Sequence, residues 1–137
     1  MNKRARFIVL GLALLFSACA AQKAGPKPAW LDARPAADDQ YLYGYGCAEP
    51  KIDNWTFKRQ TADERARVNL AENLHAYALE QVREEPAARR VIEKVLPDYA
   101  IVDRYTDHAG NLYARAALPK AELEAAIFAE LHPPHRG

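Results

Sequence analysis

Residues 41–48, YLYGYGCA, alternate between large aromatic residues and small or apolar ones before the stretch reaches a cysteine. A tyrosine-rich alternation with a period of two predicts a β-strand over residues 40–47. Glycine weakens the interior of a strand unless another element approaches it closely. Gly44 and Gly46 share one face of this strand, so we predict that a helix packs tightly against that face.

The helix that would cover the glycines is predicted downstream of the strand. A capping box over residues 61–64, TADE, places the start of this helix at Thr61. The apolar stripe that follows has a spacing of three and four residues and comprises Ala66, Leu70, Ala71, Leu74, Tyr77, Ala78 and Val82. The glycines should meet this stripe near its start, at Ala66, Leu70 and Ala71.

The remaining elements complete an α+β pattern. Pro86 ends the long helix or opens a shorter one over residues 87–96. Two strands are predicted over residues 98–106 and 112–118, and the turn DHAGN between them predicts a hairpin. A final helix begins at Pro119 and carries the stripe Leu123, Ile127 and Leu131. We therefore predict a small three-stranded antiparallel sheet with one long and two shorter helices on one face, in the order strand, helix, helix, strand, strand, helix.

The first residues of the chain predict a lipoprotein signal. Three basic residues precede the uncharged apolar run FIVLGLALLF at residues 7–16. This run is too short to cross a hydrocarbon core of about 30 Å and instead indicates a secretory signal peptide over residues 1–18. The next residue is Cys19, and FSAC resembles a bacterial lipobox, in which the cysteine is acylated through sulfur and becomes the new N-terminus. The alternative is an ordinary signal peptide followed by an incidental cysteine.

An acylated Cys19, carrying an S-diacylglyceryl group and an N-palmitoyl chain, would hold the protein on a membrane. Each buried methylene group contributes about 0.8 kcal/mol, and one chain alone holds only marginally, so the three chains of a mature bacterial lipoprotein anchor stably. Residue 20 is alanine and not aspartate, which in enterobacteria-like sorting implies transport to the outer membrane. We predict a lipid-anchored outer-membrane protein whose domain faces the periplasm.

The mature chain would be a single small domain on a tether. Cleavage before Cys19 leaves 137 − 18 = 119 residues, and a net charge of 16 − 18 = −2 with the histidines neutral. No basic stripe remains, so we predict no nucleic-acid partner. The proline- and alanine-rich composition of residues 19–39 predicts an extended tether, of which Trp30 and Leu31 dock onto the domain. The domain is then predicted over residues 40–132, with a tail over residues 133–137.

No set of residues indicates catalysis, a metal site or a cofactor. A nucleophilic Cys47 would need a base and an oxyanion site, which no sequence argument places beside it, and a buried thiol packed under a helix is the favoured interpretation. The hairpin turn lacks the alternating ligands of a calcium loop. His132 and His135 could bind a metal only with ligands from elsewhere in the chain. We predict a protein that is not an enzyme and that holds neither metal nor cofactor.

The tyrosines provide the candidate interaction surface. Strand pairing brings like faces together, so Tyr41, Tyr43 and Tyr45 should lie on the same side of the sheet as Tyr113. Tyr99 and Tyr105 join them if the register allows. One interpretation is that tyrosine simply favours strands. The other is an open aromatic face, turned away from the helices, that binds a partner or a second copy of the chain.

Four stretches, together with the lipobox, resemble a known family. They are PAWL at residues 28–31, YLYGYGCA at 41–48, ARVNLAENL at 66–74 and VDRYTDHAGNLYARAAL at 102–118. They are similar to the small bacterial lipoproteins with the LPP-twenty domain, whose relatives include a Helicobacter membrane-associated antigen and flagellar outer-membrane lipoproteins. The resemblance implies an envelope lipoprotein without known catalytic residues, a binding or assembly component linked to flagella or to envelope structure. The alternative is a small periplasmic ligand carrier or enzyme, which would need a deep pocket with convergent polar groups.

Overall fold

A computed structural model describes residues 25–135, so the predicted signal peptide and Cys19 lie outside the described residues. The described chain contains three strands, β1 (Tyr41–Ala48), β2 (Ala100–Thr106) and β3 (Leu112–Pro119). They form one antiparallel sheet in the order β1-β3-β2, in which β3 is central and β1 and β2 are edge strands. The predicted α+β class with a three-stranded antiparallel sheet is confirmed.

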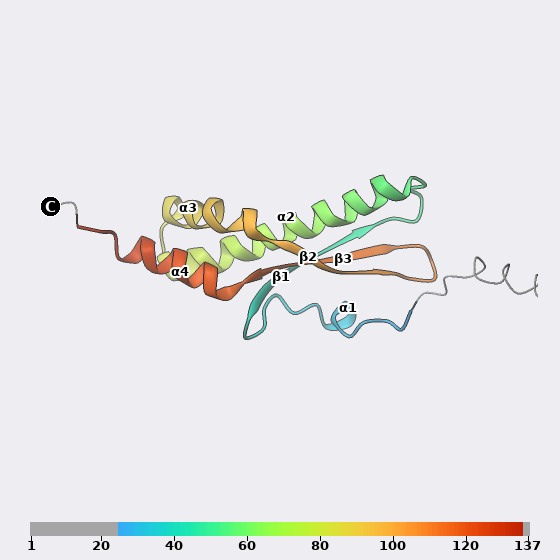
Figure 1. The fold of residues 1–137 in the computed structure, drawn as a ribbon, viewed down its shortest axis with the longest axis horizontal. Coiled ribbons are helices and arrows are strands. Elements are labelled where there is room, and N and C mark those ends of the chain that lie inside the picture. Colours follow the sequence, from blue (N-terminus) through green and yellow to red (C-terminus); the bar gives the residue numbers. More distant parts are fainter. Residues whose placement is uncertain (1–24, 136–137) are drawn as a thin grey trace, which may run out of the picture.

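The helices lie on both sides of the sheet and not on one face as predicted (Figure 1). The long helix α2 (Trp55–Val82) runs along one face, and α3 (Glu85–Val95), a turn η1 (Leu96–Asp98) and α4 (Lys120–Leu131) pack together at the end away from the β2–β3 hairpin. A short helix that was not predicted, α1 (Trp30–Ala33), lies on the other face. Four residues between prolines have no helical periodicity, so the sequence pattern could not indicate α1.

The predicted start of α2 is wrong by two turns. The N-cap is Asn54, whose Oδ1 accepts a hydrogen bond from the Phe57 amide at 2.9 Å. Thr61 lies inside the helix, where its hydroxyl donates to the Phe57 carbonyl at 2.8 Å. Glu64 binds the guanidinium of Arg67 instead of closing a capping box. The sequence pattern did not indicate this extension, because the first three residues of α2 are all exposed and do not belong to the buried stripe.

The buried positions of α2 recur at every fourth residue. They are Lys58, Ala62, Ala66, Leu70, Leu74, Ala78 and Val82. Because an α-helix has 3.6 residues per turn, each step of four residues turns the buried face by about 40°. The stripe therefore winds around the helix, which lets the N-terminal part of α2 face the sheet while its C-terminal part faces α3 and α4.

The predicted contact between the strand glycines and the long helix is confirmed. A Cβ atom built on Gly44 would lie 2.6 Å from the Cα of Leu70 and closer still to the Ala66 carbonyl oxygen. One built on Gly46 would lie 2.9 Å from the carbonyl carbon of Arg65 and closer still to the Ala62 carbonyl oxygen. Real Cβ atoms do not approach backbone this closely, so glycine is required at both positions. Ala62, in place of the predicted Ala71, completes the contact.

The register places the tyrosines together on the opposite face. Tyr45 pairs with Arg115 and Cys47 pairs with Tyr113, so Tyr41, Tyr43 and Tyr45 share the face of Tyr113 as predicted. In β2 the register shifts between Ile101 and Asp103, which lets Ile101 pack against the core on the helix side while Tyr105 lies opposite Tyr113. Tyr99 precedes the strand and packs against the core, so it does not join the tyrosine face.

Candidate interaction surfaces

The tyrosine face is not open. Residues 28–39, here called the latch, cross this face of the sheet and bury Trp30 and Leu31 to 8% and 7% exposure. Tyr43 is only 7% exposed, and only Tyr41, at 37%, counts as exposed among the four candidate tyrosines. The predicted docking of Trp30 and Leu31 is confirmed, and the prediction of an open aromatic surface is wrong because the chain's own N-terminal segment covers it.

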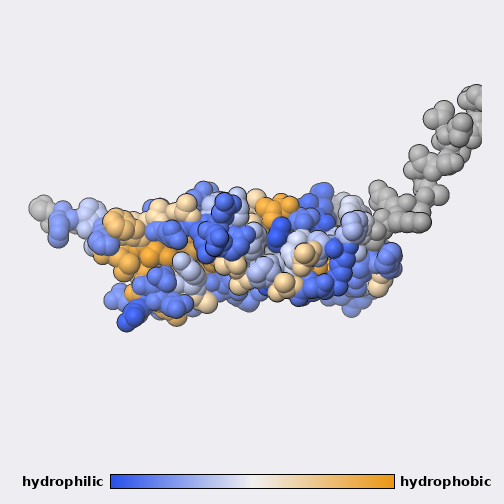
Figure 2. All heavy atoms as spheres, turned by 90° about the horizontal axis from the view of Figure 1, so that it is seen from below, coloured by the Kyte–Doolittle hydropathy of each residue, from blue (hydrophilic) through white to orange (hydrophobic). Residues whose placement is uncertain are grey.

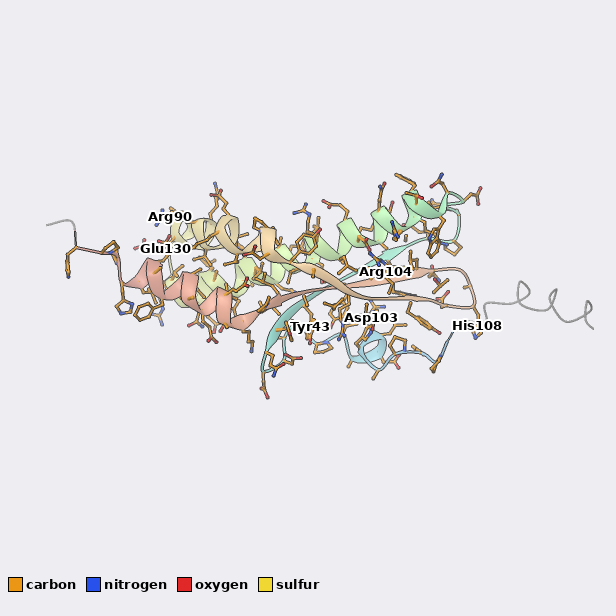
Figure 3. The ribbon with its side chains drawn as sticks, in the orientation of Figure 1. Tyr43, Arg90, Asp103, Arg104, His108 and Glu130 are labelled. Atoms are coloured by element: carbon orange, nitrogen blue, oxygen red, sulfur yellow. The ribbon has the colours of Figure 1, made fainter. Side chains whose placement is uncertain are left out.

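Trp30 is the centre of the latch. Its ring stacks on Tyr45 with the ring centroids 5.7 Å apart, and its Nε1–H donates a hydrogen bond to Asp103 Oδ2 at 2.7 Å. The guanidinium of Arg115 lies 5.4 Å from the Trp30 ring centroid and 4.7 Å from that of Tyr43. These stacking and cation–π contacts give the aromatic residues partners within the chain. Figure 3 shows Tyr43 and Asp103 on the side of the sheet that α1 covers.

Asp38 binds the second half of the latch to β1 through hydrogen bonds. The Tyr43 hydroxyl donates to Asp38 Oδ2 at 2.5 Å, and Asp38 Oδ1 accepts from the amides of Gln40 and Tyr41, both at 2.8 Å. The hydrogen bond to Asp38, together with burial, raises the pKa of Tyr43 to about 12. The same hydrogen bond and the two amides lower the pKa of the Asp38 carboxyl. The latch is thus held by a neutral phenol and an ionised carboxylate.

The backbone amides and carbonyls on the outer edge of β1 also find hydrogen-bond partners within the chain. Tyr43 donates its amide to the Ala36 carbonyl in the latch at 2.9 Å. From α2, Asn73 Nδ2 donates to the Tyr43 carbonyl at 2.8 Å, and Asn69 Oδ1 accepts from the Tyr45 amide at 2.9 Å. An edge strand covered in this way does not offer its backbone to another strand. Strand addition at β1 is therefore not how this domain would bind a partner.

We expect the latch to respond to pH in two separate windows. Because folding lowers the pKa of the Asp38 carboxyl, this group adds stability at pH values above its ordinary pKa of about 3.9. This stability is lost as the pH falls through the pKa that the carboxyl has in the folded protein. Because folding raises the pKa of the Tyr43 phenol, this group adds stability at pH values below its ordinary pKa of about 10. This stability is lost as the pH rises through the pKa of the folded protein's Tyr43, about 12. Tyr43→Phe should remove the phenol contribution and the largest single part of the Asp38 contribution, since the two amides still bind Asp38, and should cost about 1 kcal/mol at neutral pH.

Thermal unfolding measured across pH checks this prediction. Tyr41→Phe is the matched control, because Tyr41 lies on the same face of the same strand but is exposed. The control should keep the pH profile of the unchanged protein. Identical profiles for both variants would show that the bond between Tyr43 and Asp38 does not hold the latch.

A groove lies between the start of the described chain and the β2–β3 hairpin. It has a volume of about 590 Å³, and its lining includes Lys27, Asp32, Asp107, His108 and Tyr113. Its charged groups are engaged with neighbours: Lys27 Nζ lies 2.6 Å from Asp32 Oδ1. The Asp107 carboxylate accepts hydrogen bonds from Asn111 at 2.9 Å and from the Tyr113 hydroxyl at 3.3 Å.

The residues considered for nucleophilic or metal chemistry lie apart in the fold. Cys47 is a half-buried free thiol, and burial raises its pKa, which disfavours the reactive thiolate. His75 Nε2 lies 2.6 Å from Glu85 Oε1, and His132 stacks on Phe128 with the ring centroids 4.2 Å apart. Within residues 25–135, no group of three or more His, Cys, Asp or Glu side chains could hold a metal ion.

Helix α4 carries exposed apolar residues that the sequence stripe did not reveal. Leu123, Ala126 and Ile127 are buried against the core, whereas Phe128 and Leu131 are 63% and 50% exposed. Leu131 had been predicted to face inward. The exposed apolar positions on this helix, here called the α4 patch, are Ala121, Ala125, Phe128, Ala129 and Leu131, and the carboxylates of Glu122 and Glu124 are exposed beside them. Figure 2 shows hydrophobic surface gathered at the end of the molecule opposite the N-terminal segment.

The chain was compared with protein-family models and with curated proteins. No protein-family model matches it, and no curated protein matches it. Among the helices of residues 25–135, none combines the length and the apolar character that a membrane span requires.

Proposed function

We propose that this protein is a non-catalytic outer-membrane lipoprotein, anchored through acylated Cys19, whose periplasmic domain is a binding or assembly component of the cell envelope. The lipobox around Cys19 supports the anchor. The resemblance of residues 28–131 to the LPP-twenty lipoproteins supports the function class, with a flagellar or structural envelope protein as the partner. The observation that carries the assembly role is the α4 patch.

The α4 patch has the properties of a surface that binds another protein. An amphipathic helix ordinarily turns its large apolar side chains inward and its charged ones outward, yet Phe128 and Leu131 lie with Glu122 and Glu124 on the exposed side of α4. Large side chains such as Phe128 contribute much of the binding energy in protein interfaces. A double hydrogen bond from Arg90 to Glu130, at 2.9 and 3.0 Å, ties α4 to α3 and so fixes the patch in place (Figure 3).

A ligand carrier would use the groove beside the hairpin, and this role is less well supported. Lys27 and Asp32 of the groove pair with each other, Asp107 is bound by Asn111, and the opening is lined mainly by residues of the N-terminal segment and the hairpin. The α4 patch, by contrast, leaves the large apolar side chains of Phe128 and Leu131 at least half exposed, which favours the assembly role.

Site-specific photo-crosslinking in intact cells tests the assembly role. A photoreactive residue at position 128 should give a discrete crosslinked adduct with the lipidated protein. The same residue at Val68, which is 43% exposed on α2, is the matched control and should not give that adduct. Leu131→Glu should remove the adduct while leaving the melting temperature unchanged. The same adducts from both positions, or an adduct that survives Leu131→Glu, would contradict the α4 patch as the binding surface.

A further inference from the structure

The first turn of α2 extends beyond the part of the helix that packs on the sheet. Trp55 and Phe57 are 56% and 59% exposed, and the first buried residue of the helix is Lys58. The Lys58 ammonium donates a hydrogen bond to the Gly110 carbonyl in the β2–β3 hairpin. The two exposed aromatic side chains therefore belong to the hairpin end of the molecule.

The N-terminal segment leaves the domain at this same end. Gly25 and Lys27 line the groove together with Asp107 and His108 of the hairpin. Figure 1 shows the start of the described chain, the hairpin and the start of α2 at one end, with α3 and α4 at the other. Cys19 precedes Gly25 by six residues, which span at most about 20 Å in any conformation. An acylated Cys19 would hold this end, and not the α4 patch, close to the bilayer.

The tether is therefore much shorter than the sequence predicted. A free segment over residues 19–39 would have lifted the domain away from the headgroups, but the latch binds residues 28–39 to the sheet. The short remaining link brings the first turn of α2 within reach of the headgroup layer. That layer extends the roughly 30 Å hydrocarbon core to about 40–45 Å in total.

The chemistry of this turn suits a bilayer surface. Tryptophan is enriched at the interface between headgroups and hydrocarbon, because its ring is apolar and its N–H is polar. Residues 51–59 expose two basic side chains, Lys51 and Arg59, against the single carboxylate of Asp53, while Lys58 is buried on the Gly110 carbonyl. This exposed net charge of 2 − 1 = +1 favours anionic headgroups.

We propose that Trp55 and Phe57 insert into the headgroup layer as a second membrane contact beside the lipid anchor. The contact orients the domain so that the α4 patch points away from the membrane. This inference rests on the proposed acylation of Cys19, and it adds an orientation that acylation alone does not supply.

Tryptophan quenching in vesicles tests the contact. The lipidated protein is reconstituted into vesicles of phosphatidylethanolamine and phosphatidylglycerol, with and without bromine on the acyl chains. Brominated lipid should quench the fluorescence of the unchanged protein. Trp55→Phe retains only the buried Trp30 and should lose this quenching. Phe57→Ser should weaken it, whereas Val102→Ser, at a 49% exposed position on β2, should leave it unchanged.

The outcomes separate this contact from the anchor. Protein that floats with the vesicles but shows the same quenching with and without Trp55 would overturn the contact while leaving the anchor intact. A protein partner at this end would leave Trp55 unquenched in vesicles that contain no other protein, and so would also overturn it. Protein that does not float with the vesicles would overturn the anchor and this proposal with it.

Discussion

Gly44→Ala is expected to unfold the domain or to leave it barely stable. The added methyl group would lie 2.6 Å from the Cα of Leu70, so α2 would have to move away from β1 by about 1 Å to restore an ordinary carbon–carbon contact. That movement would stretch the hydrogen bond that Asn73 donates to β1 and the one that Asn69 accepts from it. We expect a loss of about 3 kcal/mol or more, a large share of the stability of a small domain.

Chemical denaturation of the purified protein measures this effect. Gly46→Ala should be similarly damaging, because its methyl group meets the backbone of Ala62 and Ala66. Gly25→Ala is the matched control: no atom lies within 4 Å of the position of its added Cβ, and it should change stability by less than about 0.5 kcal/mol. Equal stability of Gly44→Ala and Gly25→Ala would show that α2 does not press against this strand.

Cys19→Ser is expected to release the protein from membranes completely. A serine has no thiol to receive the diacylglyceryl group, so neither that group nor the later N-acyl chain would be added. The remaining contact through Trp55 and Phe57 would be too small to retain the protein, since even one acyl chain binds only marginally. Labelling with a fatty-acid analogue should fall to background, and the protein should move from the membrane fraction to the soluble or precursor fraction.

Cys47→Ser is the matched control for this loss. It removes the other cysteine, which lies half-buried in the folded domain, and should leave both labelling and membrane fractionation unchanged. Undiminished membrane fractionation of Cys19→Ser would defeat the lipoprotein interpretation, whatever the state of the folded domain.

The two faces of β1 could be predicted from the sequence because strand geometry is local. Alternation fixes which side chains share a face, and glycines at positions 44 and 46 are explained only by a close neighbour. The structure pairs small residues across β1 and β3 on the helix side, such as Gly44 with Ala116. The fold class was therefore accessible from short-range pattern alone.

The latch could not be predicted in this way, because its contacts join residues that are far apart in the sequence. Trp30 and its acceptor Asp103 are 73 residues apart, and no periodic pattern connects them. The guanidinium of Arg115 packs against the rings of both Trp30 and Tyr43, and no sequence pattern indicates these contacts. The prediction of an open tyrosine face failed for this reason: composition indicated an extended segment, and specific partners on the sheet were needed to order it.

The exposed aromatic residues were missed for a different reason. Trp55 and Phe57 precede the capping box at Thr61 that was taken as the helix start, so they fell in a predicted loop. Asn54, a residue type favoured at helix N-caps, was the available signal. On α4, the unbroken apolar run at residues 125–129 was the signal that apolar residues also lie on the exposed side of the helix.

The mass of the N-terminal peptide of the mature protein tests the central claim most directly. The protein is extracted from membranes with detergent and digested, and its first peptide is identified by mass spectrometry. We predict a peptide that begins at Cys19 and carries a diacylglyceryl group on Sγ and an acyl chain on the α-amine. A mature chain that begins at another residue, or a Cys19 that bears no lipid, would contradict the account.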